Sequence, residues 1–253
     1  MKFFYVRITK CACQTLHKIF TSKPVSDFYI DAVKNKSLSR SPIDKALGLT
    51  LNEFRLPPNC LSVSFVRNPF DRAISAYYYS RSRPKIFGYL ADPKLTFLSF
   101  LHLTRDLLNE GIPSKQIVSY RHLLPQSNFL LHQGSPFIDF IGRVEHLDAH
   151  LSELSALILK RSSLCPRERG NVKFIKAPQL NRSPRPKQAM KEFKKRSLLV
   201  EEVTTTSTTT TTTQAYSNPE CINLVKQIYS ADLRRFNYSL EKNPELPIIN
   251  HNY

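Results

Sequence analysis

Residues 6–20 decide the expected fold, and they read Val6-Arg7-Ile8-Thr9-Lys10-Cys11-Ala12-Cys13-Gln14-Thr15-Leu16-His17-Lys18-Ile19-Phe20. The residues before Lys10 are aromatic or β-branched, as in a buried strand: Phe3, Phe4, Tyr5, Val6 and Ile8. After Lys10 the apolar side chains recur at helical spacing, at Leu16, Ile19 and Phe20. The stretch therefore predicts a strand, a tight turn and a helix.

The turn of this unit has features of an anion-binding loop. A strand that runs into a helix brings unpaired backbone N–H groups and the positive end of the helix dipole to one point. Lys10 would add a cation, Ala12 keeps the turn narrow, and Thr15 offers a hydroxyl donor. Because the turn has no glycine, the usual nucleoside-triphosphate loop does not fit. An ordinary turn without a ligand stays open as the alternative.

The composition indicates one globular domain with an anionic partner. A chain of 253 residues can bury a full core, and we expect a single domain over 1–253. The formal net charge of +17 suits nucleic acid, an acidic membrane, a nucleotide or a polyanionic sugar. The charge alone does not choose among them.

The cysteine pattern suggests neither a metal site nor a disulfide framework. The five cysteines are odd in number and show no Cys-x-x-Cys spacing, so no metal is expected. The N-terminus shows no signal or anchor segment, because the apolar run at 1–8 is too short and continues into the turn. We therefore expect no membrane span in this chain, which leaves open a soluble protein or a form lacking its anchor.

A second strand–turn–helix unit follows at residues 60–78. The run Cys60–Val66 alternates into an apolar end and predicts a strand. Asn68 can cap a helix, Pro69 suits its first position, and Asp71 complements its positive end. The residues with helical spacing that we expect in the core are Phe70, Ala73, Ile74, Tyr77 and Tyr78.

Two polar residues of this second unit are candidate phosphate ligands. Arg67 lies between the strand and the helix, at the carboxyl edge of a sheet, where ligands bind in open α/β folds. With the Ser75 hydroxyl two turns later, its guanidinium could hold a phosphate by charge-assisted hydrogen bonds. The alternative is that Arg67 pairs with Asp71 and that Ser75 only fills space.

Five blocks of the chain together resemble a known family. Residues 10–15 are similar to the Pro-Lys-x-Ala-Cys-Thr-Ser loop that binds the 5′-phosphosulfate in Golgi-type carbohydrate sulfotransferases, of the chondroitin, dermatan and HNK-1 types. Residues 65–77 resemble that family's 3′-phosphate motif, which is the more specific match. Three later blocks, at 140–147, 180–183 and 228–238, resemble the family's Phe-Ile-Gly-Arg, Leu-Asn-Lys-Ser and Tyr-x-x-Asp segments.

The resemblance implies a fold, a reaction and a set of site residues. The fold would be α/β, with a P-loop-like parallel β-sheet flanked by helices. The reaction would transfer a sulfuryl group from 3′-phosphoadenosine 5′-phosphosulfate (PAPS) to a hydroxyl of a glycan or proteoglycan, without a metal. Lys10 would neutralise charge on the bridging oxygen during transfer. The cofactor-binding residues would be Lys10, Cys11, Ala12, Cys13, Gln14, Thr15, Arg67, Ser75, Arg182 and Ser183.

The chain departs from the family at three positions. Thr9 stands for a proline, Gln14 for a hydroxyl residue, and Asn237 for a glycine. Gln14 bears on activity, because one hydroxyl donor beside the phosphosulfate is lost, although an amide can also donate.

The general base is less defined than the phosphate ligands. Related enzymes use a glutamate or histidine, and Glu53 is our preferred candidate. We expect Glu145 to be a structural partner of Arg143 or of a backbone N–H instead. His102, His122 and His132 are expected to be packed or surface residues.

Two segments in the second half have unusual composition. Residues 160–196 carry thirteen Lys or Arg against two Glu, which near a cleft would attract the donor and an acidic glycan. Residues 203–213 are almost entirely threonine, and we interpret about 197–217 as a disordered insertion.

Other functions fit these observations less well. A kinase would require a glycine-rich loop ending in Lys-Ser or Lys-Thr, which is absent from the sequence. A nucleic-acid-binding protein would intersperse aromatic with basic residues, whereas 160–196 contains only Phe174 and Phe193. A sulfotransferase-like protein that binds a nucleotide or polyanion with impaired catalysis stays open. The resemblance also implies a Golgi membrane or luminal location, and the oligomeric state is not indicated.

Overall fold

The structure is a computed structural model that describes residues 2–23, 25–30, 60–111, 120–132, 135–136, 138–161 and 214–249. Several expectations lie outside these residues. They are the base candidate Glu53, the loop residues Arg182 and Ser183, and the threonine tract at 203–213.

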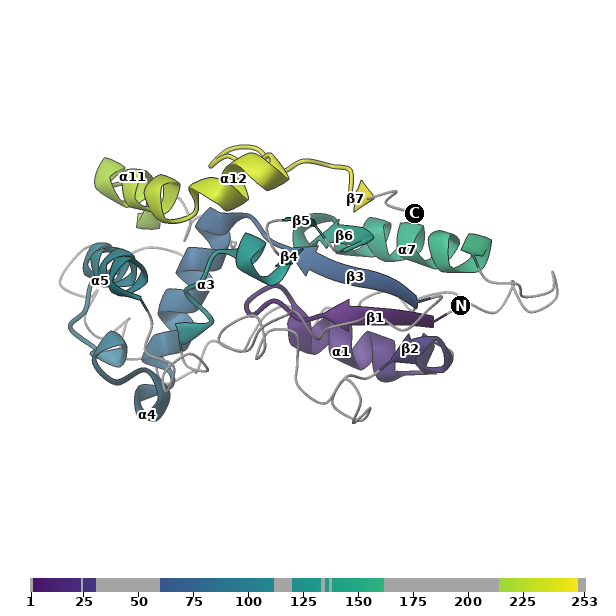
Figure 1. Cartoon of the computed structure of the whole chain (residues 1–253). Helices are drawn as coiled ribbons and strands as arrows, with labels where there is room; N and C mark the ends of the chain where they lie inside the picture. Colours follow the sequence, from purple (N-terminus) through teal and green to yellow (C-terminus); the bar gives the residue numbers. More distant parts are fainter. Residues whose placement is uncertain are drawn as a thin grey trace.

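A five-stranded sheet with the order β2-β1-β3-β6-β7 forms the centre of the molecule (Figure 1). The first four strands are parallel to their neighbours, and β7 runs antiparallel to β6. Their bounds are β1 Lys2–Val6, β2 Tyr29–Ile30, β3 Cys60–Val66, β6 Phe140–Arg143 and β7 Ile248–Ile249. The expected α/β fold is confirmed. It differs from the expected parallel sheet in its antiparallel edge strand, which is common in otherwise parallel sheets.

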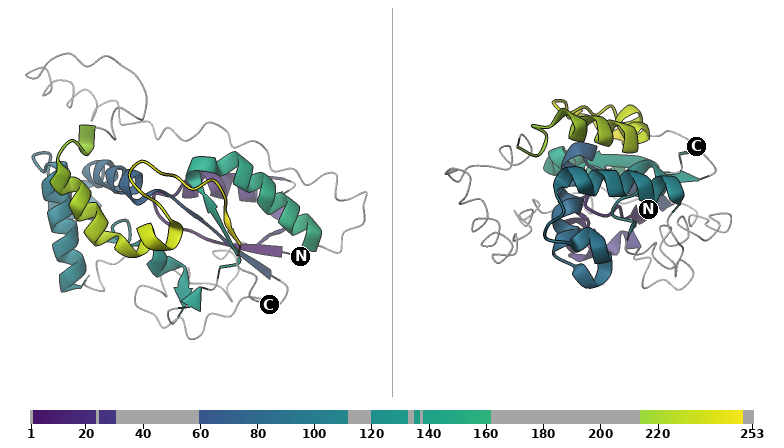
Figure 2. Two further views of the ribbon diagram at one scale, coloured as in Figure 1. Left: turned by 90° about the horizontal axis from the view of Figure 1, so that it is seen from above. Right: turned by 90° about the vertical axis from the view of Figure 1, so that its left-hand side faces the viewer.

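The helices cover both faces of this sheet and extend beyond its end (Figure 2). The α-helices are α1 Cys13–Thr21, α3 Pro69–Arg81, α4 Pro84–Phe87, α5 Phe97–Glu110, α7 Leu147–Arg161, α11 Pro219–Ile228 and α12 Ser230–Phe236. Short 3-10 turns are η1 Val25–Asp27, η4 Gly88–Ala91, η6 Gln126–Phe129 and η7 Val144–His146, and β4 Leu131–His132 pairs with β5 Ser135–Pro136.

The alternation of side chains along β1 and β3 produces two core layers. Phe3, Tyr5 and Phe65 pack with α1 and α7 on one face. Phe4 and Val66 pack on the other face with residues 124–130 and with the residues that end α12. A Cβ at Gly142 of β6 would lie 2.3 Å from the Phe65 ring, so this position requires glycine.

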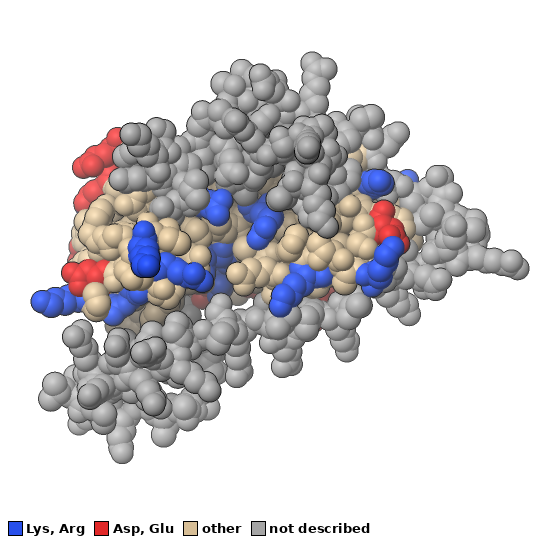
Figure 3. Space-filling view, turned by 90° about the horizontal axis from the view of Figure 1, so that it is seen from below, with Lys and Arg blue, Asp and Glu red and all other residues tan. Residues whose placement is uncertain are grey.

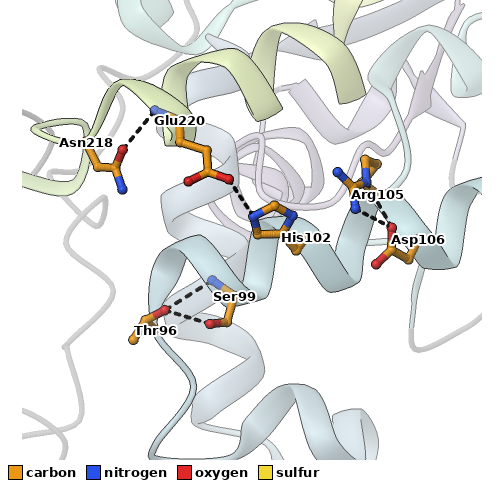
Figure 4. A network of polar contacts seen from close by, with 7 residues as sticks. All are labelled: Thr96, Ser99, His102, Arg105, Asp106, Asn218 and Glu220. Atoms are coloured by element: carbon orange, nitrogen blue, oxygen red, sulfur yellow. Dashed lines mark hydrogen bonds and ion pairs between the residues drawn. The ribbon is translucent and has the colours of Figure 1, made fainter.

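A third cluster lies beyond the carboxyl ends of the strands. It joins α3, α5 and α11 through buried side chains that include Phe70, Tyr77 and Phe100. On its surface, His102 of α5 lies 2.9 Å from a Glu220 carboxylate oxygen of α11 (Figure 4). Figure 4 also shows Asn218 accepting a hydrogen bond from the Glu220 N–H at the start of α11. His102 is therefore part of a surface contact between two helices.

Most of the predicted core positions are confirmed. Phe70, Ala73, Ile74 and Tyr77 are buried on α3, but Tyr78 is 40% exposed and its prediction was wrong. The buried stripe of α3 passes instead through Arg72, which is 1% exposed. Helical spacing alone misplaced this stripe, because a guanidinium with backbone acceptors can take a core position.

The end of the predicted insertion is packed in the described structure. The Tyr216 hydroxyl donates to the Phe70 carbonyl at 2.8 Å, and its ring meets the Phe70 ring edge-on at 5.2 Å. Tyr216 is only 6% exposed. Tyr216 is therefore part of the packed structure, and residues 197–213 of the predicted insertion lie outside the described residues.

Candidate functional site

The two candidate phosphate-binding loops lie next to each other at one edge of the sheet. β1 and β3 are paired in parallel, with Val6 opposite Ser64. Each strand continues through a short loop into a helix, β1 into α1 and β3 into α3 (Figure 1). The carboxyl edge of a parallel sheet is the position at which open α/β folds bind ligands.

The first loop leaves the N-terminus of α1 without a side-chain cap. Ala12 is the residue before the helix, in the left-handed conformation with φ 51°, and Lys10 has φ 68°. The first turn holds no acidic residue, and the N–H of Leu16 bonds back to the Ala12 carbonyl at 3.0 Å. Backbone N–H groups at the start of a helix are oriented to bind an anion. Gln14 is exposed on this turn.

Lys10 is half-buried, and its ammonium lies 4.2 Å from the centroid of the Tyr79 ring on α3. Burial, and after it the neighbouring charge of Arg67, lowers the pKa of Lys10 to about 8. A lysine in this environment favours an anion beside it, because a negative charge would offset the cost of burying the ammonium.

The second loop is closed by its own side chains. The Asn68 side chain accepts a hydrogen bond from the Phe70 N–H at 3.1 Å, which confirms the predicted cap. One Glu145 carboxylate oxygen accepts from the Asn68 N–H at 2.7 Å, and the other accepts from the Tyr238 hydroxyl at 2.8 Å. Glu145 is therefore the structural partner of a backbone N–H that the sequence indicated. Arg143 bonds elsewhere, to the Phe236 carbonyl.

Arg67 precedes α3, and Ser75 lies within it. Arg67 follows the last residue of β3, and Ser75 is half-buried one helical turn before Tyr79. Within the described residues, neither the Arg67 guanidinium nor the Ser75 hydroxyl makes a hydrogen bond, and no ion pair joins Arg67 to Asp71. Both groups are therefore available to a ligand as far as these residues are concerned.

Arg72 is a site residue that the sequence analysis did not single out. Its Nε donates to the Thr9 carbonyl at 3.1 Å, and its Nη1 donates to the Leu124 carbonyl at 2.8 Å. Its Nη2 is buried and has no hydrogen-bond partner among the described residues. The signal was present, because the family-like motif contains this second arginine. Its alignment with the buried face of α3 was not predicted.

The loops thus bring together the cationic side chains of Lys10, Arg67 and Arg72, and the buried carboxylate of Asp232 lies close enough to Arg72 to interact with it. The charges of Arg67 and Arg72 both act on Lys10 and lower its pKa. Glu145, an acid beside this group, has both carboxylate oxygens bonded as described above. On the face seen from below, most of the charged side chains across the middle of the described surface are Lys or Arg (Figure 3). Three features fit a ligand with anionic groups. They are the uncapped start of α1, the buried Arg72 Nη2 and the half-buried Lys10.

The structure does not describe every predicted site residue. Glu53, Arg182 and Ser183 lie outside the described residues. His17 of α1 lies against the Tyr29 ring, 6.5 Å between centroids, and His122 stacks on Tyr79 at 4.8 Å.

Within the described residues, no cluster of His, Cys, Asp and Glu has a metal-binding arrangement. No helix among them has the length and apolar character to cross a bilayer.

Comparison with known proteins supports the same interpretation. A sequence model of the sulfotransferase family matches residues 1–239, which include both loops and the closing helices α11 and α12. No curated protein and no solved structure matched the chain. The family match covers most of the chain and agrees with the α/β fold. The chain therefore belongs to the sulfotransferase family.

Proposed function

We propose that this protein transfers a sulfuryl group from PAPS to a hydroxyl of a carbohydrate acceptor. The observation that carries the proposal is the meeting of three cationic side chains, Lys10, Arg67 and Arg72, at the uncapped end of α1. PAPS carries anionic groups at both its 5′ and its 3′ positions. The two loops offer a separate set of donors for each.

Each loop has a distinct proposed role. The backbone N–H groups of Cys13 and Gln14 at the start of α1, together with Lys10, would hold the 5′ side of the donor. Arg67 and Ser75 would bind the 3′-phosphate. PAPS supplies the activated sulfuryl group when bound.

Lys10 is the proposed catalytic cation. Placed at the transferring group, it would neutralise the charge that develops on the leaving phosphate as the bond to sulfur breaks. The acceptor hydroxyl must lose a proton, and Glu53 stays our candidate base. The loop residues Arg182 and Ser183 stay candidate donor ligands.

The acceptor is proposed to be a glycan, with an acidic glycan favoured by the net charge of +17. Gln14 favours a second candidate, a sulfotransferase-like protein that binds the nucleotide but transfers slowly. Gln14 is exposed in the first turn of α1, where related enzymes carry a hydroxyl. The two candidates share the nucleotide site and differ only in turnover.

Nucleotide binding tests the site. We expect 3′-phosphoadenosine 5′-phosphate (PAP) to bind more tightly than 5′-AMP in calorimetry, because only PAP reaches Arg67. Arg67→Ala should remove most of this preference. Lys85→Ala, which changes an exposed cation on α4, should retain it. Equal affinity of the wild type for PAP and 5′-AMP would contradict the proposal.

Turnover tests the reaction separately. Labelled PAPS should pass its sulfate to at least one member of a panel of neutral and acidic glycans. A protein that prefers PAP over 5′-AMP but labels no glycan would support the catalytically impaired candidate instead.

A further inference from the structure

Gln126, at the start of η6, connects the two phosphate-binding loops. Its Oε1 accepts hydrogen bonds from the Arg67 N–H at 2.8 Å and from the Cys11 thiol at 3.0 Å. Its Nε2 donates to the Arg67 carbonyl at 2.8 Å. Gln126 and Cys11 are both 0% exposed. One buried amide therefore contacts the first loop and both backbone groups of Arg67 in the second.

Asp232 of α12 fixes the position of Gln126. Its carboxylate accepts from the backbone N–H groups of Gln126 at 2.6 Å and Ser127 at 2.8 Å. One oxygen also lies 3.5 Å from the Gln126 Nε2. Because a carboxylate and the Arg67 carbonyl both face this nitrogen, the amide has only one favourable orientation, with Oε1 toward the two donors.

Arg72 adds a second connection between the same elements. Its guanidinium bonds the Thr9 carbonyl in the first loop and the Leu124 carbonyl two residues before Gln126. Both loops are thus held to residues 124–126. Apart from the Arg72 Nη2, the side-chain polar groups of this network are bonded. Such a buried network resists small displacements, so these residues set how far apart the two loops lie.

We propose that Gln126 is a positioning residue that sets the separation of the two loops to match a nucleotide with phosphates at both its 3′ and 5′ positions. This inference rests on the proposed function. A ligand that bridges two subsites gains from both only when their spacing fits. A ligand that occupies one subsite is insensitive to the spacing.

Three nucleotides test this spacing. PAP reaches both loops, 5′-AMP reaches the first, and 3′-AMP reaches the second. Calorimetry with Gln126→Met, which keeps the length of the side chain and removes its hydrogen bonds, should show PAP affinity reduced by roughly tenfold or more. The affinities for 5′-AMP and 3′-AMP should each change by less than about twofold.

A general loss of structure gives a different result. If Gln126 only supports the fold, the variant weakens all three nucleotides in proportion, and the inference is wrong. It is also wrong if the variant keeps the wild-type preference for PAP. Wild-type protein that binds PAP no more tightly than either monophosphate overturns the proposed function as well, so the two failures are distinguishable.

The Cys11 contact provides a test that does not depend on the folding of Gln126→Met. Cys11→Ala removes the donor to Gln126 and should lower the preference for PAP, whereas Cys11→Ser keeps a donor and should restore most of it. Equal preference in these two variants contradicts the inference. Tyr216→Phe is the matched control, because it removes one buried hydrogen bond, to Phe70, without touching either loop. Its preference for PAP should equal that of the wild type.

Discussion

The two strand–loop–helix units at the sheet edge share one topology but differ at the N-terminus of the helix. At β3–α3 the helix start is capped by Asn68, and Glu145 holds the N–H of Asn68 itself. At β1–α1 the preceding residue is Ala12, without a capping side chain and without an acid in the first turn. We therefore propose that the first unit contacts the ligand through backbone N–H groups. The second uses its own residues for stability, and its proposed ligand contacts are the side chains of Arg67 and Ser75.

We call the first unit, β1–α1, the open unit because no side chain caps its helix. The largest expected effect comes from removing the Lys10 ammonium of this unit. Lys10→Met should lower the rate of sulfuryl transfer by about 10²- to 10³-fold, as for the loss of one transition-state donor. Single-turnover assays with labelled donor measure this rate. Lys18→Met, which changes an exposed lysine on α1, should leave the rate within about twofold of the wild type. A rate for Lys10→Met within threefold of the wild type would remove Lys10 from the proposed mechanism.

The pH dependence of PAP binding follows from the same residue. The pKa of Lys10 in the free protein is about 8, and only the protonated ammonium attracts the anion. PAP affinity should therefore fall as pH rises above about 8, by up to about tenfold per pH unit. Calorimetry from pH 7 to pH 9.5 measures this, and the Lys10→Met variant should lose most of the dependence.

The lowered pKa of Lys10 gives folding stability the opposite pH dependence from PAP binding. The folded protein lowers the Lys10 pKa from 10.5 to about 8, so the unfolded chain binds the proton more tightly in that window. The contribution of Lys10 to the free energy of unfolding should rise with pH from about 8 to 10.5. A contribution that falls across this window, in a comparison with Lys10→Met, would contradict the buried position of the ammonium.

Much of the fold was predictable because local patterns agreed with the tertiary structure. The apolar runs of β1 and β3, the helix spacing after Lys10 and the capping residues around Pro69 each match the described elements. The strand-to-helix junction at 140–147 is also present, as β6, η7 and α7. These features depend on neighbours in the sequence.

The long-range polar network was not predictable from one sequence. Gln126 meets Cys11 and Arg67 across 115 and 59 positions, and no periodic pattern marks such a contact. Arg72 was quoted as part of a motif, yet its burial follows from carbonyl acceptors at Thr9 and Leu124. The roles of Glu53, Arg182 and Ser183 stay predictions.

A smaller effect is expected when the start of α1 is given an acidic residue like the one at the start of α3. Gln14→Glu places an acid in the first turn of α1, as Asp71 does in α3. It should stabilise the helix by about 0.3–1 kcal/mol, which corresponds to a rise of about 1–4 °C in melting temperature. It should also weaken PAP binding severalfold, more at low salt than at high salt.

The control for Gln14→Glu is Gln14→Thr, which brings a hydroxyl donor in place of the amide and adds no charge. This variant should bind PAP at least as well as the wild type. If Gln14→Glu binds PAP with wild-type affinity at low salt, the start of α1 does not face the ligand.

The smallest expected effect concerns backbone strain in the open unit. Ala12 has φ 51°, and the left-handed conformation costs an alanine about 1–2 kcal/mol. Ala12→Gly removes this cost but gives the unfolded chain more freedom, which offsets about 0.4–1 kcal/mol. The net gain in the free energy of unfolding should be about 0.5 kcal/mol, measured by urea denaturation without ligand.

Asn237, after α12, is the matched comparison for Ala12. It has φ 54°, and asparagine adopts this conformation at little cost. Asn237→Gly should therefore change stability by less than Ala12→Gly does. If Ala12→Gly lowers stability instead, the packing of the Ala12 methyl group against the α1 core outweighs the strain. The open loop would then be held by side-chain contacts rather than strained into place for its ligand.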